Sequence, residues 1–256
     1  MIELTAQDVS FRRANHWIIQ QANFTVPSAA ITALLGINGV GKTTLLKLLA
    51  GLWQPTYGKI WLNQQSLSTF SPRTLATHLS FVAHNVPAPF AFTVQEAVWM
   101  GRYPYQSKWQ AATEQDRQAV FTAMQQTDIL HLRSRDLTTL SNGERQRVWI
   151  ARSLATEADM ILLDEPTANL DIAHSLEIMQ LCQNLVQQGK TVVFSTHDLN
   201  LAAHYSQNLY VLQRGKVVAM GAPNAVLTDA LLRQVFDVKV ERLVTSSGKE
   251  ILWFGR

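Results

Sequence analysis

The sequence predicts an α/β fold: a parallel core sheet, an antiparallel β subdomain at the N-terminus, and a helical subdomain inserted into the core. Three observations predict it. A fully apolar run, Ile31–Leu35, leads into a glycine-rich turn and then into a helical pattern. A second apolar run, Met160–Leu163, ends directly in two carboxylates. Between the two runs, residues 85–140 carry helical patterns and no strand pattern, as expected of a helical insertion.

The composition is that of a cytoplasmic protein with a large core. Of 256 residues, 47% are hydrophobic, and no apolar run approaches the roughly 18 residues that cross a bilayer. The first residues lack the basic start and apolar stretch of a secretory signal. The single cysteine, Cys182, is expected to be a small buried side chain. The net charge of +3 comes without a block of lysine or arginine, so nucleic acid is not an expected partner.

Three strands are predicted before the glycine-rich turn. Alternating polarity in residues 2–11 and 17–26 indicates half-exposed antiparallel strands. The continuous apolar run Ile31–Leu35 indicates a buried parallel strand instead. The turn is therefore expected to leave the core of the sheet.

Residues 36–44 read Gly-Ile-Asn-Gly-Val-Gly-Lys-Thr-Thr and match the P-loop pattern G-x-x-x-x-G-K-[ST]. The glycines let the backbone turn around phosphate oxygens, and the helix predicted over 44–50 adds its positive N-terminal end. Lys42 is the expected cation for the β- and γ-phosphates, and Thr43 is the expected magnesium ligand. A chance glycine-rich turn is the alternative, which the flanking strand and helix disfavour. The predicted nucleotide contacts are Gly36, Asn38, Gly39, Gly41, Lys42, Thr43 and Thr44.

The next part of the chain is predicted to leave the core. The expected elements are a strand over 58–62, a short helix opened by Ser71-Pro72, a strand over 79–83 that ends at His84, and a proline-bearing loop over 86–92. Two capping boxes follow, Thr93 with Glu96 and Thr113 with Asp116. They predict a short helix to about residue 101 and a longer amphipathic helix to about residue 127.

The strand Met160–Leu163 places two carboxylates at its carboxyl end, the edge of an open parallel sheet where ligands bind. Asp164 is predicted to orient the magnesium shell, and Glu165 to activate an attacking water as general base. The alternative is a solvated strand end followed by a turn at Pro166. Together with the P-loop, the pair favours a phosphate-transfer site.

The C-terminal third is predicted to continue the alternation of helices and strands. The expected elements are a helix over 172–188, a strand over 191–195, a helix through 201–205, a hairpin about Arg214-Gly215, a helical segment over 223–236 and a short polar tail over 239–256. His197 follows the strand over 191–195, at the edge that carries Asp164 and Glu165.

Residues 140–146, Leu-Ser-Asn-Gly-Glu-Arg-Gln, predict a helix start that binds an anion. Ser141 is its N-cap, Glu144 completes a capping box, and Gly143 leaves backbone N–H groups uncovered. The alternative is a well-capped helix without a ligand. The stretch resembles the signature sequence of ABC ATPases, usually Leu-Ser-Gly-Gly-Gln, and it precedes the carboxylate strand as it does in that family.

The resemblance implies one ABC ATPase domain over 1–256 that binds ATP and Mg²⁺. Residues 1–84 and 156–238 would form its β subdomain and P-loop (RecA-like) core. Residues 85–155 would form the helical subdomain with the signature, and 239–256 a C-terminal tail. Two copies would close head to tail, so that the P-loop of each faces Ser141 and Gly143 of the other.

Three site residues follow from the resemblance. Asp171, in Ala-Asn-Leu-Asp, resembles the D-loop aspartate beside the nucleotide, and His197 resembles the switch histidine that contacts the γ-phosphate and positions the attacking water. Phe11 best matches the aromatic residue that stacks on the base, with His16 and Trp17 as rivals. Ordinary packing in a strand is the alternative for each of these rings.

Two departures from the family pattern lie at His84 and in the signature. The family generally has glutamine where this chain has His84, a residue expected to reach magnesium and the attacking water. Imidazole can replace the amide only when neutral, which predicts pH-dependent coupling or catalysis. In the signature, Asn142 and Glu144 replace glycine and glutamine, while the backbone donors at Gly143 are expected to be kept.

Residues 92–104 resemble the T-V-x-E-x-V-x-x-G-R-x-P segment of ATPases that power import of ferric siderophores, haem and cobalamin. The resemblance implies a peripheral homodimer at the cytoplasmic face of the inner membrane, with two transmembrane permease subunits and a periplasmic or surface substrate-binding protein. Val94, Val98 and Trp99 either dock on the permeases or pack internally. The alternatives are an importer of another substrate, a soluble ABC ATPase, and a nucleotide-gated scaffold that scarcely hydrolyses ATP.

Overall fold

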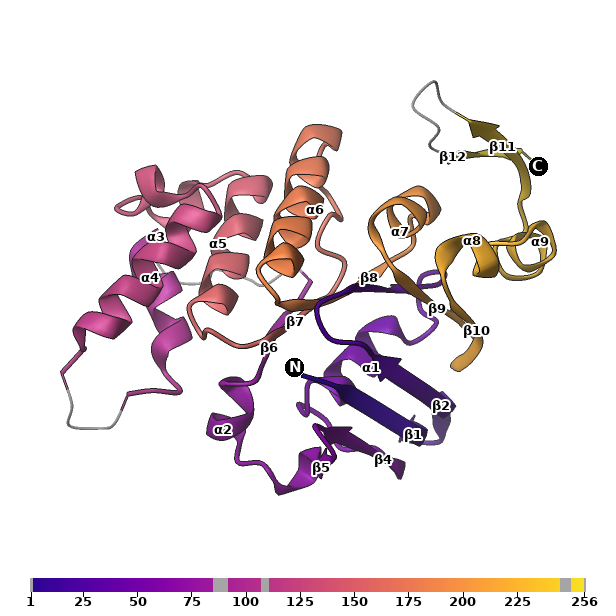
Figure 1. The fold of residues 1–256 in the computed structure, drawn as a ribbon, viewed down its shortest axis with the longest axis horizontal. Helices are drawn as coiled ribbons and strands as arrows, with labels where there is room; N and C mark the ends of the chain where they lie inside the picture. Colours follow the sequence, from indigo (N-terminus) through magenta and orange to yellow (C-terminus); the bar gives the residue numbers. More distant parts are fainter. Residues whose placement is uncertain (1, 85–91, 107–110, 245–249, 256) are drawn as a thin grey trace.

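The N-terminal strands form an antiparallel sheet of their own, as their alternating polarity predicts (Figure 1). The computed structural model describes residues 2–84, 92–106, 111–244 and 250–255. The sheet has the order β2-β1-β4-β5. Its strands are β1 (Leu4–Arg13), β2 (His16–Val26), β4 (Tyr57–Leu62) and β5 (Gln65–Ser66). Together with the core sheet described next, it confirms the predicted fold class.

A six-stranded sheet of order β10-β9-β3-β8-β7-β6 forms the core. Its strands are β3 (Ile31–Leu35), β6 (Leu79–Val82), β7 (Met160–Leu163), β8 (Thr191–Thr196), β9 (Asn208–Gln213) and β10 (Lys216–Gly221). Strands β6, β7, β8, β3 and β9 run parallel, and only β10 is antiparallel to its neighbour. The carboxyl ends of β3, β7 and β8 therefore meet at one edge, where the P-loop, the carboxylate pair and His197 follow.

Helices cover both faces of the core sheet. Helix α1 (Lys42–Leu49) packs with residues of β1, β2 and β3, so it lies between the two sheets, and it begins two residues before its predicted start. Helices α6 (Ile172–Gln187) and α7 (Leu199–Tyr205) pack in the other hydrophobic cluster, which contains buried Cys182. Burial raises the pKa of the Cys182 thiol to about 12. None of the described helices is long and apolar enough to span a bilayer.

The inserted segment is helical within its described residues. Its main helices are α3 (Val94–Trp99), α4 (Glu114–Gln126) and α5 (Asn142–Leu154), and all three predicted capping boxes form both of their hydrogen bonds. The inserted segment also has the 3-10 turns Met100–Arg102, Leu130–Leu132 and Leu137–Thr139. The 3-10 turn Leu67–Thr69 and helix α2 (Pro72–Ala76) precede it in the chain. Except for residue 92, the predicted loop over 86–92 lies outside the described residues, and the subdomain boundaries stay a prediction.

The C-terminal end differs from its prediction in two respects. The helical segment is broken into α8 (Pro223–Val226) and α9 (Asp229–Phe236), because Thr228 turns out of the helix and caps α9. The predicted polar tail is wrong: β11 (Lys239–Val244) and β12 (Glu250–Gly255) pair as antiparallel strands. Leu252 is buried in the core, and the Asn200 side chain bonds both backbone groups of Leu252, which attaches the strands to α7.

Candidate active site

The P-loop places a buried ammonium group at the carboxyl end of β3. Lys42 is only 5% exposed, and its Nζ donates to the carbonyl oxygens of Gly36 at 2.9 Å and Ile37 at 3.3 Å. Gly39 and Gly41 have φ angles of +79° and +109°, in the left-handed region that favours glycine. The loop therefore curls around its own lysine, and this cationic cradle fits the phosphate groups of a nucleotide.

Asp164 is the buried acceptor of two hydroxyl groups. It is 2% exposed, and its Oδ1 accepts from Thr43 Oγ1 at 3.0 Å and from Ser195 Oγ at 2.7 Å. Ser195 Oγ in turn accepts the Glu165 N–H at 2.9 Å, so one hydroxyl links β8 to both carboxylate residues. The sequence did not single out Ser195, whose only signal was its place at the end of a predicted strand next to the switch histidine.

The Thr43 hydroxyl and the Asp164 carboxylate together suit Mg²⁺, which prefers oxygen ligands and usually takes one or two carboxylates together with phosphate and water. The described residues contain no group of three or more His, Cys, Asp or Glu side chains that could hold a metal ion by itself. A metal here would therefore need oxygen atoms from a bound nucleotide or from water.

Glu165 lies between a lysine and a histidine. Its Oε1 is 3.2 Å from Lys42 Nζ, and its Oε2 is 3.4 Å from His197 Nδ1. The backbone of Glu165 has a φ of +46°, an uncommon conformation for a residue with a side chain and one that concentrates at functional sites. Its carboxylate, 19% exposed, is thus aimed at the P-loop lysine while still reaching solvent.

A cavity of about 540 Å³ lies over this carboxylate. Asn38, His84, Glu165 and His197 all line it, so the structure brings together residues from four separate segments of the chain. None of the signature residues 141–144 belongs to the lining. One copy of the chain therefore holds Glu165 and both histidines around one cavity without the signature, and the Glu165 carboxylate links that cavity to Lys42.

The signature begins α5, as predicted. Ser141 accepts the Glu144 N–H at 3.2 Å, and the Glu144 carboxylate accepts the Ser141 N–H at 2.8 Å, which holds the pKa of that carboxyl below its usual value. Gly143 lies against His174 near the start of α6, whose N-cap is Asp171. The structure thus gathers Ser141, Gly143 and Asp171 in a second cluster.

The aromatic residues near the first strands form two separate pairs. Phe11 stacks on Trp53 with ring centroids 5.3 Å apart and an interplanar angle of 16°. Trp17 is 44% exposed and lies 6.0 Å from Tyr57 in a tilted arrangement. Phe11 already uses one stacking contact and Trp17 offers the more exposed ring, so the choice among Phe11, Trp17 and His16 stays a prediction.

Residues 19–168, more than half of the chain, match the ABC transporter family. The chain belongs to the ABC transporter family. Its place there is that of the ATP-binding subunit, which confirms the resemblance seen in the signature. The P-loop and the Asp164-Glu165 pair both lie within the matched residues, whereas His197 lies beyond them.

Three relatives from this ABC family match nearly the whole chain at 36% identity. The ferric enterobactin transport ATP-binding protein FepC of Escherichia coli K12 matches 92% of this chain and 88% of its own length. The corresponding shares are 94% and 90% for the iron(3+)-hydroxamate import protein FhuC of Bacillus subtilis. They are 97% and 93% for the hemin import protein HmuV of Nitrobacter winogradskyi.

A solved structure gives the same picture of this ABC subunit. An inward-facing metal-chelate type ABC transporter matches 100% of this chain and 97% of its own, with a TM-score of 0.86 and 31% identity. The likeness covers both sheets and the helical segment, so the arrangement described above is that of the family.

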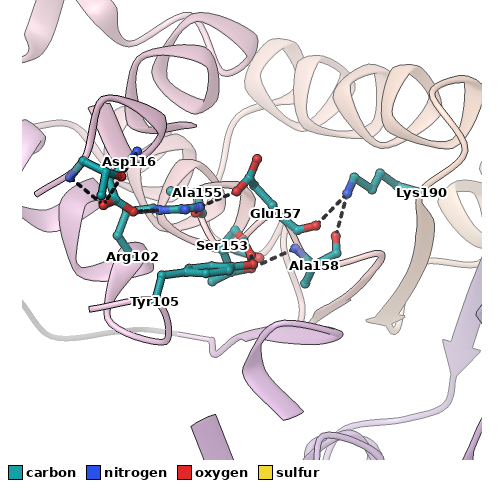
Figure 2. A network of polar contacts seen from close by, with 10 residues as sticks. Arg102, Tyr105, Asp116, Ser153, Ala155, Glu157, Ala158 and Lys190 are labelled. Carbon is teal, nitrogen blue, oxygen red and sulfur yellow. Dashed lines mark hydrogen bonds and ion pairs between the residues drawn. The ribbon is translucent and has the colours of Figure 1, made fainter. Parts of the chain in front are cut away.

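The importer-like segment of this ABC subunit is mostly internal. Val94 and Val98 are fully buried and Trp99 is partly buried against the core, so these three residues pack internally. Arg102, 1% exposed, bonds Asp116 through Nε at 2.8 Å and Glu157 through Nη1 at 2.6 Å (Figure 2).

The motif's glycine and arginine thus have structural explanations. At Gly101 a Cβ atom would lie 2.2 Å from the Arg152 carbonyl oxygen, so only glycine permits this approach to α5. Arg102 also donates to the Ala155 carbonyl at 2.8 Å, at the C-terminal end of α5. The pair therefore fastens the segment to the rest of the helical part.

Proposed function

We propose that this chain is the ATP-hydrolysing subunit of an importer for an iron chelate (a ferric siderophore or haem) or for cobalamin. The observation that carries the proposal is the nearly full-length similarity to FepC, FhuC and HmuV, combined with the position of Glu165 between Lys42 and His197. The similarity supports the transport system, and the geometry supports hydrolysis.

The P-loop residues bind the nucleotide. Lys42 leaves its contacts with its own loop carbonyls to neutralise the β- and γ-phosphates, because an anion is a stronger partner for an ammonium group than a carbonyl. Thr43 and Asp164 would hold Mg²⁺, which would shield phosphate charge. Ser195 fixes the orientation of Asp164 by donating to it.

Glu165 is the general base. Its carboxylate lies at the cavity wall and accepts the proton of the water that attacks the γ-phosphate. His197, 3.4 Å from the same carboxylate, orients that water and the terminal phosphate. His84 lines the same cavity and takes the position of the family's glutamine.

A second copy of the chain completes the site. Its Ser141 and Gly143 supply the helix start that the cavity lacks in a single copy. Asp171 of the same second copy approaches the nucleotide together with them. ATP then favours the closed dimer because it contacts both copies only in that state.

A groove of about 750 Å³ offers the place for a permease segment. Trp53, Phe70, Met100, Tyr103 and Arg152 are among its lining residues, so it lies between the core and the helical segment. Met100 is 43% and Tyr103 76% exposed. A permease helix held in this groove would move when the ATPase dimer closes, and this would transmit the closure to the membrane subunits.

Uptake in cells tests the proposal. A strain without this chain should lose accumulation of radiolabelled ferric siderophore, haem or cobalamin, and the native chain should restore it. Chains with Lys42→Ala or Glu165→Gln should not restore uptake, although the cells contain as much of the variant protein as of the native protein. Uptake of all three ligands at the normal rate without the chain would contradict the proposed substrate class.

A further inference from the structure

His174 joins the D-loop aspartate to the signature helix of the same chain. It lies in the first turn of α6, and its Nδ1 is 2.8 Å from both carboxylate oxygens of Asp171. Its backbone N–H also donates to Asp171 Oδ1, at 2.9 Å. The hydrogen bond from this N–H is the main reason that the pKa of the Asp171 carboxyl lies below its usual value, and the contact with the imidazole ring is the second. Asp171 is therefore an ionised acceptor tied to one histidine.

The other side of the imidazole ring packs on the signature. A Cβ atom built on Gly143 would lie 2.8 Å from Cδ2 and 3.0 Å from Cγ of His174, closer than side chains approach one another. The ring therefore fills the space that any other residue at position 143 would need. His174 is 41% exposed, so this packing is at the surface rather than in the core.

One helical turn further along, a second contact joins the same two helices. Arg147 of α5 pairs with Glu177 of α6, and its Nη1 donates to the Thr127 carbonyl at 3.1 Å. This ion pair holds the bodies of α5 and α6, which lie side by side in Figure 1. His174 instead holds their first turns, where Gly143 and Asp171 lie.

The two helices belong to different parts of the molecule. Helix α5 packs mainly with α3 and α4 in the helical segment and also contacts the edge strand β6, whereas α6 packs on the inner core strands β8 and β3. Any movement of the helical segment against the core would separate Gly143 from Asp171 unless a contact holds them together. His174 touches both residues.

We propose that His174 is a positioning residue for the shared nucleotide site. It holds Asp171 and the start of the signature helix in fixed register, so that both reach the second copy and its ATP in one step. The inference rests on the proposed function, in which the signature of one copy closes on the P-loop of the other.

ATP-driven dimerisation tests the role. With Glu165→Gln as the parent chain, sedimentation measures the dimer at increasing ATP, and a fluorescent ATP analogue measures nucleotide affinity in the monomer. His174→Ala should weaken dimerisation by roughly ten- to 150-fold, the effect of losing a hydrogen bond to a charged group, and should leave monomer affinity unchanged. His174→Asn, whose amide can donate near the Nδ1 position, should recover most of the loss.

Glu177→Ala is the matched control, because it breaks the neighbouring contact of α5 and α6 without touching Gly143 or Asp171. It should dimerise as the parent does. Parent-like dimerisation of His174→Ala would overturn the inference, and so would an equal loss in Glu177→Ala. If His174→Ala also lowers the thermal midpoint, dimerisation of His174→Asn is compared with that of Glu177→Ala. Recovery in both variants supports the positioning role, and a loss in His174→Asn as large as in His174→Ala overturns it. A parent that binds ATP but never dimerises would overturn the shared site itself.

Discussion

Replacing Arg102 with alanine should destabilise the chain far more than replacing an exposed arginine nearby. Arg102 is 1% exposed and has four partners: Asp116, Glu157, the Ala155 carbonyl and the ring of Tyr105, whose centroid lies 4.0 Å from the guanidinium carbon. Figure 2 shows how these partners surround it. The single substitution therefore removes contacts to the helical segment and to the connection that leads into β7.

The size of the effect follows from what is left behind. Removing one partner of a buried ion pair costs about 3–5 kcal/mol because the other charge remains buried. In the Arg102→Ala variant Asp116 still accepts two hydrogen bonds from Thr113, one from the Thr113 N–H at 2.9 Å and one from the Thr113 hydroxyl at 2.7 Å. We therefore expect the lower end, about 3 kcal/mol, which corresponds to roughly 6–12 °C in Tm for a chain of this size.

Urea unfolding of the purified chain, followed by circular dichroism, measures this difference. The control is Arg117→Ala on α4, where the ion pair with Glu114 is 60% and 82% exposed, and it should cost about 0.5 kcal/mol. Arg102→Lys should fall between them because it keeps the charge but loses the planar fork. If Arg102→Ala costs no more than Arg117→Ala, the buried ion pair does not stabilise the fold.

Three further predictions concern pH and nucleotide binding. His84→Gln should change ATP turnover and its pH profile, because an amide does not titrate as an imidazole does, and an unchanged rate and profile would contradict the predicted pH dependence. The hydroxyl and N–H of Thr113, with Arg102, lower the pKa of Asp116 to about 2. Its stabilisation should be complete above about pH 4 and lost as the pH falls towards 2, whereas Asp116→Asn should lack this acid-dependent loss in urea unfolding. Finally, Phe11→Ala or Trp17→Ala should weaken binding of a fluorescent ATP analogue by about tenfold, and the variant that does so identifies the stacking ring. Full affinity in both would exclude stacking by either.

Local signals predicted most of the elements near the site. The capping boxes at Thr93, Thr113 and Ser141 each satisfy backbone groups within four residues, so their sequence pattern and their geometry carry the same information. The P-loop and the strand before Asp164 are equally local. For this reason the sequence placed Lys42 and Asp164 at the correct edge of the sheet.

Contacts between distant segments were beyond the sequence. The predicted polar tail overlooked the apolar residues of 239–244 and 250–255, which pair as strands, whereas the attachment of Leu252 to Asn200 joins residues 52 positions apart. Arg102 was part of a recognised motif, yet its ion pair with Glu157 joins residues 55 positions apart. His174 contacts Gly143 only because α5 and α6 pack together.

The proposed function depends most on Glu165 as the general base of an ATPase. Steady-state ATP turnover of Glu165→Gln at saturating ATP, compared with that of the native chain, measures this role. We expect at least a ~100-fold fall in turnover while ATP stays bound and dimers accumulate, since a general base contributes about two to four orders of magnitude. Turnover within a few-fold of the native rate would contradict it.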